Sequence, residues 1–186
     1  MSDNAKNQIK DLNQTTVLEL LPNFPIVLVS VAENVITVNQ IHYFSFSPLR
    51  IGIGIAYERY SYDLIKEKSE FIINIPQEEQ IEAVKKCGKI SGENNDKFKL
   101  CDLSKEKSIN CDSFTIKEIG ASIECKVERE IEFENRSWFV GKVVAAQKSK
   151  DHDSDKSLLC GRHNYQHQVG LLQRDNFNSA NCYVVK

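Results

Sequence analysis

The sequence predicts a mainly β protein, a small antiparallel barrel with a few peripheral helices. Three observations support this fold class. About seven short segments have strand character, only two or three have helical character, and the two kinds do not alternate regularly, which disfavours a doubly wound parallel sheet. Because the 186 residues contain no internal repeat and no linker, we expect a single domain over residues 1–186, with a loose helix at residues 5–21 as an N-terminal appendage.

The expected strands are short, rich in β-branched and aromatic residues, and bounded by turn residues; they cover residues 26–31, 35–39, 49–56, 71–75, 122–128, 130–134 and 138–147. The first two form a hairpin, and a tight turn at Asn135-Arg136 connects the last two. The strand at residues 49–56 alternates Ile with Gly. Glycine inside a strand indicates a close backbone approach or a bulge, so we expect another surface to lie tightly against this strand.

Two helices are expected beside the barrel. The first extends from Ser61, as the N-cap, through Lys68. The second, residues 77–87, begins with acidic residues, ends with lysines and meets Gly88 at the C′ position, which satisfies the rules for both helix ends. Residues 88–113 are rich in Gly, Asn and Lys and have few apolar anchors, so we expect them to form a long connection.

The charge pattern argues against nucleic acid and membranes as partners. The 24 Lys and Arg residues and the 26 Asp and Glu residues give a net charge of -2 and are scattered along the chain. The N-terminus is polar, and the longest apolar stretch, residues 26–32, is far shorter than the roughly 20 residues that cross a bilayer. We therefore expect a cytoplasmic protein without a visible secretion signal.

The usual nucleotide, metal and hydrolase motifs are missing: the chain has no GxGxxG, GxxxxGK[ST], HExxH or GxSxG. His163 and His167 stand four residues apart, but no further ligand follows at a suitable spacing, so no metal site is expected. The six cysteines lie at long, irregular separations, which is typical of free thiols. A disulfide between Cys101 and Cys111 under oxidation is the less favoured alternative.

Small hydroxyl and amide side chains gather at or near the ends of the expected strands; they are Thr37, Asn39, Gln40, Ser45, Ser61, Asn74 and Ser91. Taken singly, such residues are usually turn formers. As a group they can donate hydrogen bonds to a phosphate and to a polar heterocycle, and the helix expected after Ser61 adds N–H groups and a dipole that favour an anion. These residues therefore allow a phosphate site without a P-loop.

Five segments, taken in their order along the chain, carry a resemblance to a known family. They are NVITV from Asn34, HYFSFSP to Pro48, IGIGIAYERYSYDLI to Ile65, EFIINIP to Pro76 and CGKISGENNDKF to Phe98. In this order and spacing they resemble the flavin reductase-like family, in its flavoredoxin branch. The later segments WFVGKVV and LCGRHNYQ resemble the closing strand and the C-terminal segment of that family, so the resemblance spans roughly residues 22–172.

The resemblance implies an antiparallel Greek-key split β-barrel of the FMN-binding type, which works as a homodimer with the flavin near the subunit interface. It implies FMN as the cofactor, with NADH or NADPH as a possible electron donor. Because the flavin carries the chemistry, no catalytic dyad is expected from the protein.

The resemblance also implies a set of cofactor-binding residues. Along the flavin ring and the ribityl chain it places Thr37, Val38, Asn39, Gln40, Ser45, Asn74 and Ile75. At the phosphate it places Arg59, Tyr60, Ser61 and Tyr62, with Ser91 and Lys97 as a lid or a further phosphate contact. His42 is either a substrate contact over the flavin or a structural histidine at an interface.

The sequence departs from the family pattern at the expected site. Asn39-Gln40 stands where many flavoredoxin-like sequences have Ala-Trp, and Glu93 stands where a basic residue is common. Three functions stay open: an FMN-dependent oxidoreductase that uses NAD(P)H or a protein donor, a flavoredoxin-type electron carrier with a redox protein partner, and a flavin-free binding barrel.

Overall fold

A seven-stranded antiparallel sheet curls into the barrel of the computed structural model, which describes residue 17, residues 20–161 and residues 168–170. Its strands follow the spatial order β3-β2-β6-β9-β10-β5-β4. Their bounds are β2 Val27–Val31, β3 Asn34–Val38, β4 Ile41–Phe46, β5 Leu49–Ala56, β6 Glu70–Asn74, β9 Ala121–Glu132 and β10 Arg136–Lys148. The mainly β, antiparallel fold class is thus confirmed, whereas almost all of the expected helix at residues 5–21 lies outside the described residues.

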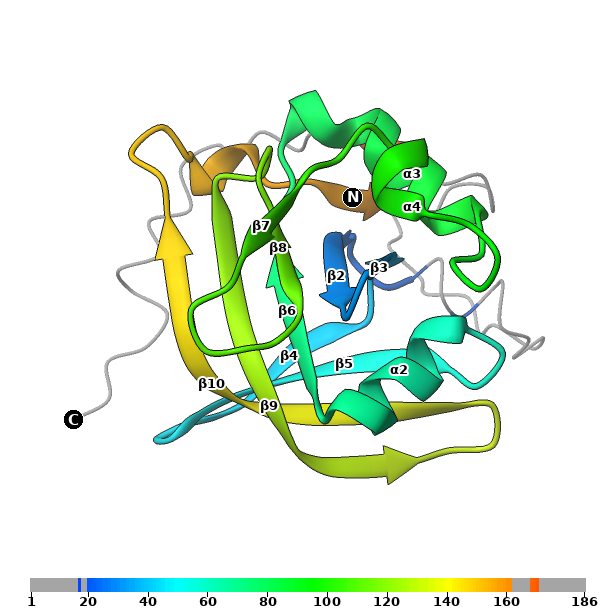
Figure 1. Cartoon of the computed structure of the whole chain (residues 1–186). Coiled ribbons are helices and arrows are strands. Elements are labelled where there is room, and N and C mark those ends of the chain that lie inside the picture. The colour runs from blue at the N-terminus through cyan, green and yellow to red at the C-terminus, as the bar shows by residue number, and fades with distance from the viewer. Residues whose placement is uncertain (1–16, 18–19, 162–167, 171–186) are drawn as a thin grey trace, which may run out of the picture.

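Short helices and minor strands surround the barrel. The helices are α2 Tyr60–Lys68, α3 Ile81–Lys89 and α4 Lys97–Leu100, with 3-10 turns at Glu78–Gln80 and Ser154–Lys156. The minor strands are β1 Phe24–Pro25, β7 Lys105–Lys107, β8 Phe114–Ile116, β11 Leu159–Gly161 and β12 Gln168–Gly170. Figure 1 shows α2 against the lower end of the β9–β10 hairpin and α3 with α4 at the opposite, upper end.

Strand β2 separates two hydrophobic clusters, and all five of its residues are buried. Val27, Val29 and Val31 point into the barrel, where they pack with residues such as Phe71 and Phe139. Leu28 points the other way, into the cluster beneath α3 and α4. A strand that is covered on both faces reads as a continuous apolar run, which is why this segment was easy to recognise from the sequence.

The β9–β10 hairpin is longer than expected. The expected strands at 122–128 and 130–134 are one strand, because Glu128 is an extra residue: Val127 pairs with Gly141 and Arg129 pairs with Val140. Such a bulge bends the strand and breaks the alternation of side chains, so the sequence looks like two strands. Arg136, expected in the turn, is the first residue of β10.

The predicted start of the first helix and the predicted end of the second were wrong, whereas the predicted end of the first helix at Lys68 is confirmed. Arg59, without a side-chain cap, precedes α2, and Ser61 is its second residue. The Ser61 hydroxyl is turned inward and accepts a hydrogen bond from the Asn34 amide at 2.7 Å. Helix α3 runs through Gly88 to Lys89, so Gly88 is helical and not a left-handed C′ residue.

Residues 88–113 contain more structure than their composition predicted. Phe98, Cys101 and Leu103 are buried beneath α3 and anchor this segment to the outer cluster. Asp96 caps α4 by accepting a hydrogen bond from the Lys99 N–H at 3.2 Å. Strand β4, which was not expected, follows a two-residue connection after β3 and forms one edge of the large sheet.

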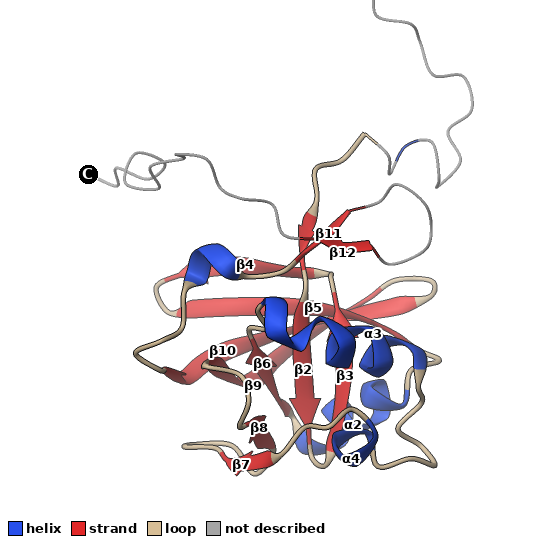
Figure 2. Ribbon diagram, turned by 90° about the horizontal axis from the view of Figure 1, so that it is seen from above, coloured by secondary structure: helices blue, strands red, loops and turns tan. Residues whose placement is uncertain are grey.

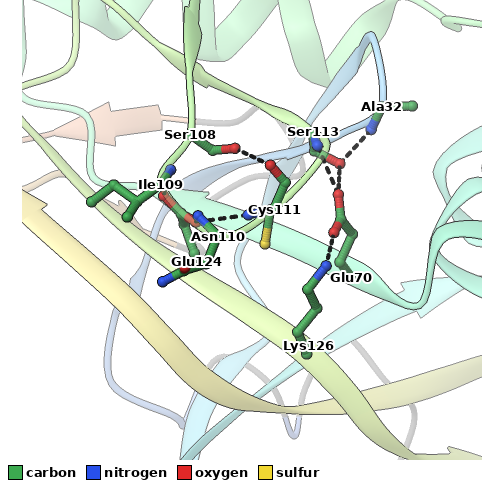
Figure 3. Close-up of polar contacts among 9 residues, drawn as sticks. All are labelled: Ala32, Glu70, Ser108, Ile109, Asn110, Cys111, Ser113, Glu124 and Lys126. Carbon is green, nitrogen blue, oxygen red and sulfur yellow. Dashed lines mark hydrogen bonds and ion pairs between the residues drawn. The ribbon is translucent and has the colours of Figure 1, made fainter.

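Two buried carboxylates tie the loop at residues 108–113 to the barrel (Figure 3). Glu124 accepts hydrogen bonds from the N–H groups of Ile109 and Asn110, each at 2.7 Å, and of Cys111 at 3.1 Å. Glu70 accepts from the Ser113 N–H at 2.7 Å and hydroxyl at 2.6 Å, and pairs with Lys126. We call Glu70, Glu124 and these partners the carboxylate cluster.

Candidate functional site

A half-open cavity of about 230 Å³ lies where the ends of β3 and β5 meet helix α3. Figures 1 and 2 show α3 beside β3, and β3 also contacts β5, so three elements distant in sequence enclose one space. The lining residues are Ile26, Ile36, Thr37, Val38, Asn39, Gln40, Gly54, Ile55, Ala56, Glu58, Arg59, Val84, Lys85, Gly88 and Arg136.

One wall of the cavity is held by Thr37. Its hydroxyl donates a hydrogen bond to the Val84 carbonyl at 2.6 Å, which fixes α3 against β3. Gly88 lies one helical turn further along α3, and a Cβ on it would lie 3.5 Å from the Thr37 Cβ. Because glycine leaves this space open, the cavity extends to the backbone of α3.

The opposite wall is formed by Gln40 and Gly54. A Cβ on Gly54 would lie 2.3 Å from the Gln40 Oε1 atom, so only glycine allows the amide to lie across β5. This confirms the close approach that the Ile-Gly alternation predicted. The Gln40 Oε1 atom is buried and has no hydrogen-bond partner in the described part of the chain. Buried polar atoms normally have one, so this atom is an unsatisfied acceptor in the wall of the cavity.

Basic side chains outnumber acidic ones among the residues that line the cavity: the basic residues are Arg59, Lys85 and Arg136, and the acidic residue is Glu58. Beyond the cavity, Lys97 is buried, and its ammonium donates to the Cys87 carbonyl at 2.7 Å. Burial lowers the pKa of Lys97, and the positive charge of Arg59 lowers this pKa further. A nearby anion would stabilise this charged group, so the electrostatics on this side favour an anionic ligand.

Five of the residues assigned by resemblance line the cavity: Thr37, Val38, Asn39, Gln40 and Arg59. Tyr60 and Ser61 follow directly at the start of α2, where Tyr60 is exposed and Ser61 is buried against Asn34. Gly92 lies over the same asparagine, since a Cβ on it would be 2.0 Å from Asn34 Oδ1 and 3.2 Å from the Lys97 Cδ. This connects the segment of Ser91 and Lys97 to the start of α2.

The other assigned residues lie outside the lining of the cavity, and their roles stay predictions. Ser45 is near the end of β4, where its hydroxyl donates to the Pro48 carbonyl in the following turn at 2.6 Å. Tyr62 donates to Glu130 at 2.9 Å on the barrel side of α2. Asn74 is fully buried and uses its amide to connect β6 with the Leu28 carbonyl and the Ile116 N–H. Ile75 follows it, half-buried, against the barrel core.

His42 lies on β4 with an exposed side chain, its ring 4.6 Å from that of Tyr43 in an edge-on arrangement. It does not line the cavity. The structure therefore gives His42 no contact to the space between β3, β5 and α3, and its role as a substrate contact stays a prediction.

Sequence reasoning did not identify Arg136, Lys85, Gly54 or Gly88 as residues of the site. Arg136 reaches the cavity because β10 pairs with β5, with Arg136 opposite Ala56. That pairing joins segments 80 residues apart, so no local sequence pattern predicts it. The Ile-Gly alternation around Gly54 was a usable sign, because it indicated the close contact without naming the partner.

Neither a metal cluster nor a reactive thiol emerges from the described residues. They contain no group of three His, Cys, Asp or Glu side chains placed to hold a metal ion; His163 and His167 lie outside them. Cys101 and Cys111 form no disulfide with each other; like Cys87 and Cys125, they are free thiols. Burial raises the pKa of Cys111 to about 12 and that of Cys125 to about 12, so these thiols stay protonated at neutral pH.

The fold and the site together define a class of protein: an antiparallel barrel with a polar, partly cationic cavity at the ends of two strands. The chain belongs to the Flavin reductase like domain family, whose sequence profile matches residues 22–168. The family assignment made from the order of the motifs is therefore confirmed.

In the part that the structure describes, no helix is both long enough and apolar enough to cross a membrane.

Two curated relatives, each described only as an uncharacterized protein, align with part of the chain. The relative from Archaeoglobus fulgidus is 35% identical over 111 residues, which are 60% of this chain and 63% of the relative. The relative from Pyrococcus abyssi is 33% identical over 112 residues, or 60% of this chain and 64% of the relative. The alignment thus spans less than two thirds of either relative.

Solved structures resemble the whole fold more completely. The flavoredoxin of Desulfovibrio vulgaris (Miyazaki F) has a TM-score of 0.79 at 20% identity, covering 94% of this chain and 99% of that chain. The flavoredoxin from Methanosarcina acetivorans has a TM-score of 0.81 at 20% identity, covering 95% and 97%. An FMN-binding protein from Thermus thermophilus has a TM-score of 0.75 at 18% identity, covering 95% and 98%.

The split-barrel architecture is confirmed by the same comparison. A structure from Shewanella frigidimarina that is described as having a split barrel domain has a TM-score of 0.72 at 13% identity, covering 78% of this chain and 81% of that chain. At identities of 13–20% these likenesses concern the fold.

Proposed function

We propose that this chain binds FMN in the cavity between β3, β5 and α3, and passes electrons from NAD(P)H or a protein donor through the flavin to an acceptor. One observation carries the proposal. In a chain of the Flavin reductase like domain family, the cavity gathers five residues that the family resemblance assigned to the cofactor: Thr37, Val38, Asn39, Gln40 and Arg59.

The residues of the cavity fit a flavin. Ile36, Val38 and Val84 offer apolar surface for the face of a ring, and the side-chain amide of Gln40 brings polar groups for its polar edge. The volume of about 230 Å³ is below the roughly 300 Å³ at which pockets for drug-sized ligands begin. The cavity would therefore enclose only part of FMN, and the rest would lie along the cationic mouth.

When bound, FMN would supply the hydride and electron chemistry, so the chain has to bind and orient it. The Thr37 hydroxyl is committed to the Val84 carbonyl, and its part is to hold the wall in place. Asn39 and Gln40 bring amide groups to the cavity, and Arg59 brings a positive charge suited to a phosphate.

A flavoredoxin-type electron carrier is the second candidate. The two flavoredoxins cover 94–95% of this chain with TM-scores of 0.79 and 0.81, and this likeness supports the carrier as the alternative. Such a carrier would hold FMN and exchange electrons with a redox protein partner.

The visible absorption spectrum of the purified full-length chain tests the proposal, first alone, then after addition of FMN and, under anaerobic conditions, of NADH or NADPH. Flavin bands that bleach within seconds of nicotinamide addition support the oxidoreductase. Bands that bleach only with dithionite favour the carrier. A chain that stays colourless and does not quench FMN fluorescence contradicts both and leaves a flavin-free binding barrel.

We also propose that the chain forms a homodimer through β4. This strand is at the edge of the described large sheet, and it exposes Phe44 at 47% and Phe46 at 63%. A second copy of the chain can cover these rings and pair with the strand edge. Light scattering coupled to size-exclusion chromatography tests this: we expect about twice the 21.2 kDa of one chain, and a Phe46→Glu variant should run as a monomer.

A further inference from the structure

Two arginines at the mouth of the cavity have no close counter-ion in the described part of the chain. Lys85, the third cation, is paired with Glu82 on the same helix at 2.8 Å. Among the residues that the structure describes, the only carboxylate within ion-pair distance of Arg59 is its neighbour Glu58, at 3.9 Å, and the side chain of Glu58 is 74% exposed. Arg136 makes no ion pair with any described residue.

The same residue of β5 brings these two arginines together. Arg136 pairs with Ala56, the last residue of β5, and the Arg59 N–H donates to the Ala56 carbonyl at 3.0 Å. Both side chains line the cavity from this end. Their arrangement follows from the β5–β10 pairing and from the backbone hydrogen bond at the start of α2.

The position of Arg136 is fixed by the tip of the β9–β10 hairpin. The Arg136 Nε donates to Asn135 Oδ1 at 3.0 Å, and the Arg136 carbonyl accepts from the Phe133 N–H at 2.9 Å. Tyr57 secures the tip from the other side, because its hydroxyl donates to the Phe133 carbonyl and its N–H to the Asn135 carbonyl. The two terminal nitrogens of Arg136, with four N–H donors, make no hydrogen bond within the described residues and are available to a ligand.

A fixed guanidinium with free terminal donors matches the oxygen atoms of a phosphate in a bidentate way. We propose that Arg136 and Arg59 clamp a phosphate monoester at the mouth of the cavity, and that this clamp makes the site select FMN over riboflavin. The inference rests on the proposed function, and it adds a residue and a specificity that the family resemblance did not include.

Flavin binding to the full-length chain tests the clamp. The dissociation constants of FMN and riboflavin are measured by fluorescence quenching for the unchanged chain, Arg136→Gln and Arg136→Lys. We expect Arg136→Gln to weaken FMN binding by about 10- to 100-fold and riboflavin binding by less than about twofold. Arg136→Lys keeps the positive charge but loses the planar guanidinium that can bind two phosphate oxygens, so its FMN affinity should lie between those of the unchanged chain and Arg136→Gln. Arg129→Gln, an exposed arginine on β9 outside the cavity, is the matched control and should bind both flavins normally.

Salt adds a second readout. The FMN affinity of the unchanged chain should fall as ionic strength rises, and the slope should be shallower for Arg136→Gln, because one phosphate contact is lost. Riboflavin affinity should show little dependence on salt in either chain. Circular dichroism tests whether each variant is folded. Asn135→Ala removes the side-chain oxygen that holds the Arg136 Nε, so it should reproduce part of the loss of FMN affinity.

The possible failures are distinguishable. An unchanged chain that binds neither flavin contradicts the proposed function itself. An Arg136→Gln chain that binds FMN normally, or that loses FMN and riboflavin equally, overturns the clamp while FMN binding stands. If this variant binds FMN normally and instead loses a preference for NADPH over NADH, the phosphate belongs to the nicotinamide donor, and the assignment to FMN is overturned.

Discussion

The protein has two regions rich in polar groups, and they differ in how completely those groups are paired. In the carboxylate cluster, Glu70 and Glu124 are at most 1% exposed, and each of their four carboxylate oxygens accepts at least one hydrogen bond (Figure 3). At the cavity, Gln40 Oε1 is buried without a partner, and Arg136 has no counter-ion among the described residues.

This difference separates stabilisation from binding. A buried polar group that is fully paired within the chain holds the fold together, whereas one left unpaired costs free energy until something else supplies the partner. The carboxylate cluster is therefore expected to respond to mutation in stability alone. The cavity is expected to respond mainly in ligand affinity.

The largest effect should follow from Glu124→Ala. The substitution leaves the N–H groups of residues 109–111 buried without their acceptor, so the free energy of unfolding should fall by about 3 kcal/mol. Urea unfolding followed by circular dichroism measures this. The FMN affinity of the folded fraction should be unchanged, and a loss of less than about 1 kcal/mol would show that the cluster does not hold the loop.

Gln40→Ala should give the opposite pattern. Because the Oε1 atom has no partner within the described chain, removing the amide breaks no hydrogen bond of that atom, and stability should change by less than about 1 kcal/mol. FMN affinity should fall roughly tenfold if the amide contacts the ligand. The same unfolding experiment and a fluorescence titration measure both quantities. Unfolding at much lower urea with intact FMN binding would reverse the comparison.

The two regions were not equally accessible to sequence analysis. The apolar runs of β2 and β5 predicted their strands, because a buried strand is made of consecutive or alternating apolar residues that are visible in the local sequence. The carboxylate cluster and Arg136 depend on contacts between segments distant in sequence, such as Glu124 with residues 109–111 and Arg136 with Ala56. Charged residues in a strand and in a turn look like solvent-exposed surface until those pairings are known.

Resemblance recovered part of what local patterns left out. It assigned Thr37, Asn39 and Gln40 to one site, and the structure brings all three to the cavity. It also assigned Ser45 and Tyr62, whose hydroxyls bond to the Pro48 carbonyl and to Glu130 away from the cavity lining. A sequence motif gives the order of residues along the chain. The direction of each side chain depends on the packing around it, which the motif does not specify.

Acid should affect the carboxylate cluster. Burial by itself raises the pKa of Glu70, but hydrogen bonds from Lys126 and Ser113 outweigh it and hold this pKa below the ordinary value of 4.5. A carboxyl whose pKa is lower in the folded state stabilises the fold above pH 4.5, and this contribution is lost as the pH falls through the lower folded pKa. Unfolding free energies measured between pH 7 and pH 3 should decline below pH 4.5, and Glu70→Gln should make that decline shallower. A slope that is unchanged in Glu70→Gln would assign the acid sensitivity to other carboxylates.

The smallest effect tests the cost of keeping the cavity open. Gly88 lies in the last turn of α3, where a Cβ would meet Thr37 at an ordinary contact distance of 3.5–3.6 Å. Gly88→Ala should therefore fit without strain and stabilise the chain by about 0.5 kcal/mol, since glycine is a poor helix former. Its methyl group occupies space in the cavity, so FMN affinity should fall by a few-fold.

Gly54→Ala is the matched comparison, because its Cβ would lie 2.3 Å from Gln40 Oε1 and must displace that amide. It should lower FMN affinity without the gain in stability. If Gly88→Ala instead stabilises the chain and leaves FMN affinity unchanged, the ligand does not reach α3. The glycine would then reflect only the packing of the helix on β3, and the binding region would be confined to the Gln40 side of the cavity.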